Sequence, residues 1–524
     1  MLFKKISNFI SNDKFLLFII FLFSFIINKN YANLGVFPID TFFHFDSAFR
    51  VLNGEYPIKD FWVVSGIFVD YLQAFFFYIF GVSWKAYTLH SSFINGILAI
   101  VTYFVLRNLQ LKKIYSFLYS LFFAVLAYPV SATPFVDQHS SLLSLLAIYC
   151  FILAINKNYF FYWILTPIFL GLAFLSKQVP SAYIIISLTF IIIFYAIKKK
   201  DLNPIKYSFV GSLIFIFIIF LVGSIQGISL SEFLKQYIIY PQNIANSRLY
   251  NLNFSFNAIV GQYKFIYLGF FPFIYLNIKN LIFNKDYLKE KNFYIFLAIS
   301  FYFFGLIFHQ ILTKNQIFIY YLCPLIFAFL KIFLKNEVYK YKNFIFLFIL
   351  IVSFSVTLKY HLRFNEGRKF HELNQVNFDL SRDAYKLDKK LAGLKWITPN
   401  YKNNPQKEID FLSETLKVIK NDKREKMVLT NYLFFSAILN ENLHAPSRSQ
   451  TLEGLSFPVK NNEYYLKYKN FFLKIIKSNK IQVIYIISSD YEVEDRFVYD
   501  YLDKACVIEH TFNKQFKKFE INKC

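Results

Sequence analysis

Long apolar runs separated by short polar segments dominate the first two thirds of the chain. Several runs reach or approach the roughly 20 residues that a helix needs to cross a bilayer. Read against their flanking charges, the runs predict about eleven crossings and therefore an α-helical polytopic membrane protein. In chain order the predicted crossings are 15–28, 86–106, 114–128, 140–155, 159–175, 180–197, 208–225, 265–283, 293–312, 317–334 and 344–358.

The lysine-rich short loops all fall on one side of this threading, as in RNLQLKK (107–113) and IKKKD (197–201). Positive loops favour the cytoplasm, so the N-terminus is predicted to be cytoplasmic and the first outer loop, 29–85, periplasmic. An odd number of crossings places the C-terminal segment, 359–524, on the same side as that loop. We expect a bacterial inner (plasma) membrane protein. The first run also resembles the apolar core of a signal peptide, with a cleavage-like NYAN (30–33) after it.

Residues 359–524 have a different pattern, with short buried-looking strands and amphipathic helical spacing. We predict a soluble, extracytoplasmic α/β domain there, beside a transmembrane domain of residues 1–358. Cys506 and Cys524 flank a candidate hairpin, and a disulfide between them is possible in an oxidising compartment. The predicted strands are LKWITP (394–399), KMVLTNY (426–432) and IQVIYIIS (481–488), and the predicted helices are EIDFLSETLKVIKN (408–421) and YYLKYKNFFLKIIKS (464–478).

Composition narrows the class of partner. Hydrophobic residues make up 56% of the chain and the formal net charge is +24. The lysines flank the apolar runs and form no arginine-rich stripe, so we predict contact with membrane lipids and no nucleic-acid binding. The four cysteines lack metal-binding spacing, so we predict no metal site built on thiolates. We predict no cofactor, and the sequence implies neither a metal requirement nor its absence.

The first outer loop concentrates acids in FPIDTFFHFDSAFRVLNGEYPIKDFW (37–62), including Asp40 and Asp60. The next segment, FVDYLQAFFFYIFG (68–81), carries Asp70 and Gln73, which make it a poor span and a better interfacial helix. A carboxylate in this loop can stay ionised at the lipid boundary. That position suits a general base acting on the hydroxyl of an acceptor, with a lipid-linked sugar as donor.

Several segments carry a wider resemblance. Asp40 precedes two of them at fixed distance, and the others follow in order: AFRVLNGEYPIKDFW (48–62), YLQAFFFYIFGVSWKAY (71–87), AYPVSATPFVDQHSSLLSLLA (127–147), LGLAFLSKQ (170–178) and IYYLCPLIFAF (319–329). Together they resemble the GT-C membrane glycosyltransferases, in the branch of the protein O-mannosyltransferases and the lipid A aminoarabinose transferase. The resemblance covers most of residues 1–358.

This resemblance implies a GT-C fold and an inverting transfer from an undecaprenyl- or dolichyl-type phosphosugar. It implies that Asp40 is the catalytic base and that Asp137 lies across the same cavity. Lys177 would neutralise the carrier phosphate, with Gln178 as a weaker companion.

Two departures from the family pattern change the phosphate candidates. Thr41 replaces the usual second acid, and VVSGIF (63–68) replaces a Lys/His-Pro-Pro segment. The second change removes a positive group associated with the carrier phosphate, so Lys59 and Arg50 join Lys177 as candidates.

Structural roles compete with these functional ones. Asp40 could cap a helix, and Lys177 could extend its amine to the interface without binding a ligand. Asp137 and His139 stand at the predicted outer end of a span, where capping competes with substrate contact. Asp60 is expected to hold a turn.

Other candidates lie in the first outer loop or near other predicted outer rims. His44 and Asp46 lie within one helical turn of Arg50, which favours a local ion pair or a solvated face. His309 could shape the carrier site. Arg248, in YPQNIANSRLY (240–250), could line the path of the acceptor or cover the membrane.

The sequence therefore predicts a polyprenyl-phosphate-sugar-dependent glycosyltransferase, with a lipid, a protein or a polysaccharide as acceptor. One rival is a transporter or flippase of lipid-linked saccharides, which would place acids in mid-span or glycine- and proline-broken helices. The charges here gather at the predicted outer rim instead. A second rival is a non-catalytic scaffold whose outer domain binds a partner.

Overall fold

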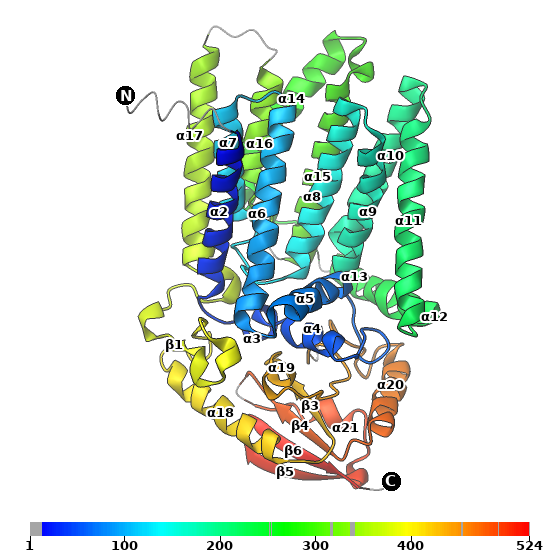
Figure 1. Cartoon of the computed structure of the whole chain (residues 1–524), viewed down its shortest axis with the longest axis vertical. Helices are drawn as coiled ribbons and strands as arrows, with labels where there is room; N and C mark the ends of the chain where they lie inside the picture. The colour runs from blue at the N-terminus through cyan, green and yellow to red at the C-terminus, as the bar shows by residue number, and fades with distance from the viewer. Residues whose placement is uncertain are drawn as a thin grey trace.

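A computed structural model describes residues 13–250, 252, 254–314, 318–335, 341–451, 454–490 and 492–522. Over these residues the protein is mostly helical, with a helical bundle at one end and a small sheet at the other (Figure 1).

Every predicted crossing falls on a helix of the bundle. Eight helices of the described chain are long and apolar enough to span a bilayer, whereas α7, α9 and α16 are shorter. The polytopic membrane fold is supported, and the number of crossings stays a prediction. The bundle helices are α2 (Asp13–Ala32), α6 (Trp84–Asn108), α7 (Lys113–Leu126), α8 (Val136–Lys157), α9 (Phe160–Ser176), α10 (Gln178–Lys199), α11 (Asn203–Ile225), α14 (Lys264–Phe283), α15 (Lys291–Thr313), α16 (Leu322–Leu334) and α17 (Lys342–Tyr360).

Burial differs strongly between the helices of the bundle. In α8, 89% of the most apolar stretch is buried, and α8 packs against α6, α9, α10 and α15. In α11 only 6% of the corresponding stretch is buried, so its apolar side chains face the surroundings. A bilayer accommodates both a central α8 and a peripheral α11, because lipid solvates apolar side chains as well as protein does.

The first loop folds into three helices across one end of the bundle (Figure 1): α3 (Pro38–Thr41), α4 (Phe45–Leu52) and α5 (Ile67–Phe80). The predicted interfacial helix over 68–81 corresponds to α5. Its two polar residues, Asp70 and Gln73, are fully buried against neighbouring elements rather than solvated.

Two connections between bundle helices also contain short helices. They are α12 (Leu230–Phe233), η1 (Leu234–Ile239), α13 (Tyr240–Tyr250), η2 (Asn257–Gly261) and η3 (Tyr287–Lys289).

The C-terminal region holds a four-stranded sheet with the order β3-β4-β6-β5. Strands β3 (Lys426–Thr430) and β4 (Val483–Ile487) are parallel and buried at every position, while β5 (Val507–Asn513) and β6 (Phe516–Ile521) form an antiparallel hairpin. A smaller antiparallel pair joins β1 (Arg382–Asp383) to β2 (Lys395–Trp396).

Helices α18 (Pro405–Asn421) and α20 (Tyr465–Ser478) confirm the two amphipathic helices expected in this region. Strands β3 and β4 confirm two of the expected strands, and the third shortens to β2. Cys524 lies outside the described residues, so its disulfide with Cys506 stays a prediction. The remaining short elements are η4 (His361–Glu366), η5 (Lys369–His371), η6 (Phe378–Leu380), η7 (Ala384–Lys386), η8 (Lys389–Leu391), α19 (Phe435–Leu439), α21 (Arg496–Tyr499) and η9 (Lys504–Cys506).

The first loop and the C-terminal region share one hydrophobic core. Phe42, Phe45 and Trp84 pack in the same cluster as Trp396 and Phe434. The acid-rich loop and the sheet therefore lie at the same end of the bundle, as the sequence predicts.

Candidate active site

Asp40 lies in α3, immediately after the first bundle helix. Pro38 begins the short helix, and the backbone N–H of Phe37 donates to Oγ1 of Thr41 at 2.8 Å. Asp40 caps no helix, and its carboxylate has no hydrogen-bond or ion-pair partner in the described part of the chain. The capping role that competes with catalysis for this residue is therefore not observed.

A second acid, Asp137, is held by two partners from different helices. Lys177 Nζ lies 2.8 Å from Oδ1 and 2.7 Å from Oδ2 of Asp137. His309 Nε2 lies 3.1 Å from Oδ1. Asp137 lies in the first turn of α8, Lys177 separates α9 from α10, and His309 lies near the C-terminal end of α15, so three bundle segments converge at this point. Three of the predicted site residues are brought together here.

The charges of this cluster act on the carboxylate of Asp40. Burial, and then the negative charge of Asp137, raise the pKa of Asp40 to about 7, while the positive charge of Lys177 opposes the rise. An acid with a pKa near neutrality exchanges protons readily at physiological pH, which is what a general base requires.

Arg248 is a cation that the sequence did not single out strongly. Burial lowers the pKa of Arg248, and the charge of Asp137 opposes that shift, which places the guanidinium within electrostatic reach of the cluster. Arg248 has no hydrogen-bond or ion-pair partner among the residues described. Its donors are therefore available to a ligand.

His139 lies in a separate buried chain of polar groups. Its Nε2 is 3.1 Å from His90 Nε2, and its Nδ1 is 2.6 Å from the hydroxyl of Tyr128. Gln73 completes the chain through His90 at 2.9 Å. His139 therefore supports the packing of α5, α6 and α8 rather than touching Asp137.

His44 is paired with the interfacial helix. Its Nδ1 lies 2.6 Å from Oδ1 of Asp70, and the hydroxyl of Ser47 donates to the same oxygen at 2.5 Å. The other carboxylate oxygen of Asp70 accepts from Arg448 of the C-terminal region. Burial alone would raise the pKa of Asp70, but the charges of Arg448 and His44 hold it below its ordinary value.

The structure does not bring the other phosphate candidates to the cluster. Arg50 is buried and paired with Glu55 at 2.6 Å. Lys59 is exposed, with its amine 5.7 Å from the ring centre of Tyr56. Gln178 donates to backbone carbonyls of two other segments, at 2.8 and 2.6 Å.

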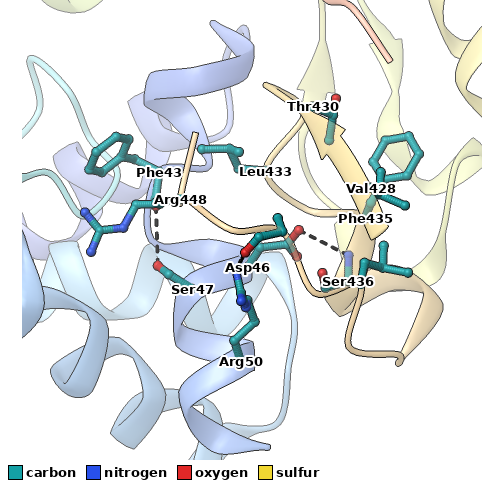
Figure 2. Close-up of a pocket in the computed structure, with 12 residues that line it drawn as sticks. Phe43, Asp46, Ser47, Arg50, Val428, Thr430, Leu433, Phe435, Ser436 and Arg448 are labelled. Atoms are coloured by element: carbon teal, nitrogen blue, oxygen red, sulfur yellow. Dashed lines mark hydrogen bonds between the residues drawn. The ribbon is translucent and has the colours of Figure 1, made fainter. Parts of the chain in front are cut away.

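Asp60 holds a turn, as predicted, by accepting a hydrogen bond of 2.8 Å from the backbone N–H of Tyr56. The expectation of a local ion pair or solvated face for Asp46 is wrong. Asp46 instead accepts from the backbone N–H of Ser436 at 3.1 Å (Figure 2) and from that of Ala437 at 2.9 Å. Its partners come from the C-terminal region, which local spacing in the sequence could not reveal.

Metal ligation has no support in the described residues, which contain no group of three or more His, Cys, Asp or Glu side chains placed to hold an ion.

Comparison with known proteins supports the family resemblance found in the sequence. Residues 64–223 match the model of a family described as dolichyl-phosphate-mannose-protein mannosyltransferase. The predicted resemblance to GT-C membrane glycosyltransferases is confirmed. The matched part of the chain contains Asp137 and Lys177 but begins after Asp40. No curated protein matches the chain.

Proposed function

We propose that this GT-C protein transfers a sugar from a polyprenyl-phosphate carrier to an acceptor hydroxyl, with inversion at the anomeric carbon. The reaction would take place on the periplasmic face of a bacterial inner membrane. The acceptor would be a lipid, a protein or a polysaccharide. The observation that carries the proposal is the unpaired carboxylate of Asp40 beside the cluster of Asp137, Lys177 and His309.

Asp40 would act as the general base. Its carboxylate takes the proton from the acceptor hydroxyl while that oxygen attacks the anomeric carbon. The bond between this carbon and the phosphate oxygen breaks, and its electron pair leaves on the polyprenyl phosphate. A base in this role commonly contributes a factor of about 10² to 10⁴ in rate.

Positive charge near Asp137 would hold the carrier phosphate. Lys177 is already paired with Asp137, which fixes its amine but leaves about a fifth of the side chain accessible, at 22%. Arg248 has no such partner, and a guanidinium can bind phosphate through two parallel hydrogen bonds. We therefore assign the phosphate to Arg248 together with the exposed side of Lys177.

An apolar groove between α10 and α15 suits the polyprenyl chain. It has about 1030 Å³ of open space and is lined mainly by aromatic and aliphatic side chains. Helix α10 begins next to Lys177 and α15 ends near His309, so a bound chain would lead toward the charged cluster. The lining residues are Tyr183, Ile186, Ser187, Phe190, Ile191, Phe194, Leu297 and Phe301.

The decisive experiment compares Asp40→Asn with Asp60→Asn in purified, detergent-solubilised protein. We expect Asp40→Asn to lower sugar transfer from a polyprenyl-phosphate sugar by at least about 100-fold, since the amide cannot accept the proton. Asp60→Asn keeps an acceptor for the turn in the same loop and should retain activity.

Full transfer by Asp40→Asn would contradict the assigned base. Movement of intact lipid-linked sugar across vesicles, without consumption of the donor, would favour a flippase. No donor consumption with tight capture of a partner by the C-terminal region would favour a scaffold. Labelling of the first loop from the cell interior would contradict the proposed sidedness.

A further inference from the structure

The C-terminal region contacts the chain just before Asp40. The backbone N–H of Gly35 donates to the carbonyl of Lys395 at 3.0 Å, and that of Val36 donates to Ile397 at 2.9 Å. These bonds extend the short β1/β2 pair toward the exit of α2. The segment that leads into α3 is thus fixed by residues more than 300 positions later in the chain.

The C-terminal region also contacts the chain just after Asp40. The ring of Phe42 lies 4.8 Å from that of Phe434 and 6.0 Å from that of Trp396, between ring centres. From across the interface, the carboxylate of Asp46 accepts hydrogen bonds from the first turn of α19, from the backbone N–H of Ser436 (Figure 2) and that of Ala437. The four residues of α3 are therefore bracketed on both sides by the same region.

Arg448 makes a buried polar contact across this interface. It is 9% exposed, and its guanidinium donates to a carboxylate oxygen of Asp70 and, at 2.6 Å, to the carbonyl of Ser65. The same group lies 4.8 Å from the ring centre of Phe43. Through Asp70 it is joined to His44. One guanidinium thus links α5 to Phe43 and His44, which follow α3 closely in the chain.

The segment that carries Arg448 follows the first loop over several residues. His444 lies 2.8 Å from Glu55, and the carbonyl of Ala445 accepts from Arg50 at 2.9 Å. The carbonyl of Pro446 accepts from the backbone N–H of Trp62 at 2.8 Å. We call residues 444–448 the strap. Its contacts with the first loop extend from Arg50 to Asp70.

The space around the strap is closely matched to Arg448. Gly66 has a φ of +82°, and a Cβ at this position would lie 3.1 Å from a guanidinium nitrogen of Arg448 and 2.7 Å from the ring of His44. A planar group that donates in two directions fits here, and the ammonium of lysine would not reproduce that geometry.

We propose that the C-terminal region is a clamp that fixes α3, and that Arg448 is a positioning residue for the reaction of Asp40. This inference rests on the proposed function for its kinetic part and on the geometry alone for its structural part. Sheet, strap and first loop then form one catalytic unit. A glycosyl transfer needs its base aligned to within a fraction of an ångström, and a shift of about 1 Å can lower a rate about 100-fold.

The structural part is tested by amide hydrogen exchange over residues 36–48 in the full chain. Arg448→Ala should raise exchange in this segment at least about tenfold, because Asp70 and His44 lose the group that holds them. Arg424→Ala is the matched control, since Arg424 pairs with Asp422 and Glu520 within the C-terminal region. Unchanged exchange in Arg448→Ala would overturn the clamp.

The kinetic part is tested on the same proteins. Arg448→Ala should lower kcat by about 10- to 100-fold with little change in KM for the donor, because the phosphate site is untouched. Arg448→Lys keeps the positive charge but lacks the planar guanidinium that donates in two directions. We expect it to recover only part of kcat. It also replaces the alanine variant if that protein does not fold.

The outcomes separate this inference from the proposed function. If wild-type protein transfers no sugar, the proposed function fails and hydrogen exchange alone decides the clamp. If wild-type protein is active and Arg448→Ala keeps its kcat, the positioning role is overturned while the role of Asp40 stands. Equal loss in Arg424→Ala would also overturn it, because the effect would then follow from any loss of charge in the region.

Discussion

Two of the carboxylates in the first loop, those of Asp40 and Asp70, lie in opposite settings. Asp70, in α5, is fully buried and satisfied by Arg448, His44 and Ser47. Asp40, in α3, faces the charged cluster at the bundle end with no partner of its own among the described residues. Burial tends to raise the pKa of both acids, and only at Asp70 do paired charges overcome it. The difference separates an acid that holds structure from one that is free to react.

The largest expected contrast is in stability. Asp70→Asn would leave the buried Arg448 without its counter-ion, and breaking such a pair typically destabilises a protein by about 3–5 kcal/mol. Asp40→Asn should leave stability unchanged or raise it. The folded pKa of Asp40 is above its ordinary value of 3.8, so ionising Asp40 lowers stability as pH rises from 3.8 to about 7.

Thermal unfolding midpoints in detergent at pH 8 measure this contrast. A clear drop for Asp70→Asn and none for Asp40→Asn is expected. Equal drops for the two variants would mean that Asp40 is also a structural acid, and the comparison would fail.

The sequence predicted the helices far better than the partners of the charged groups. Apolar runs located each bundle helix because a bilayer imposes length and composition on each segment independently. The partners of Asp46 and Asp70 lie almost 400 residues away, in α19 and the strap, and no local pattern encodes such a contact.

Arg448 shows the same limit. In the sequence it stands in an ordinary polar stretch, SRSQ (447–450), with no periodicity to indicate burial. The cluster of Asp137 and Lys177 was predicted through resemblance rather than spacing. The third member, His309, was placed only at a neighbouring rim, because the convergence of α8, α10 and α15 is a property of packing.

A smaller effect is expected in the pH dependence of transfer. Because Asp40 must be ionised to accept a proton and its pKa is about 7, kcat/KM should fall about tenfold between pH 8 and pH 6. Asp60→Asn should show the same profile. The residual activity of Asp40→Asn should no longer show this fall between pH 8 and pH 6. A flat wild-type profile over this range would assign proton transfer to another group.

The smallest effect is expected at Lys59, which the sequence ranked with the phosphate-binding cations. Lys59 is exposed, with its amine over the ring of Tyr56, so Lys59→Ala should change KM for the donor less than about twofold, as surface substitutions usually do. Arg248→Ala removes a charge-assisted hydrogen-bond donor and should raise that KM about tenfold or more. Both variants keep Asp40 and the clamp, so kcat should change little. The reverse ranking would assign the phosphate site to the exposed turn around Tyr56 rather than to the cluster of Asp137. The carrier site would then be separate from the unpaired carboxylate of Asp40.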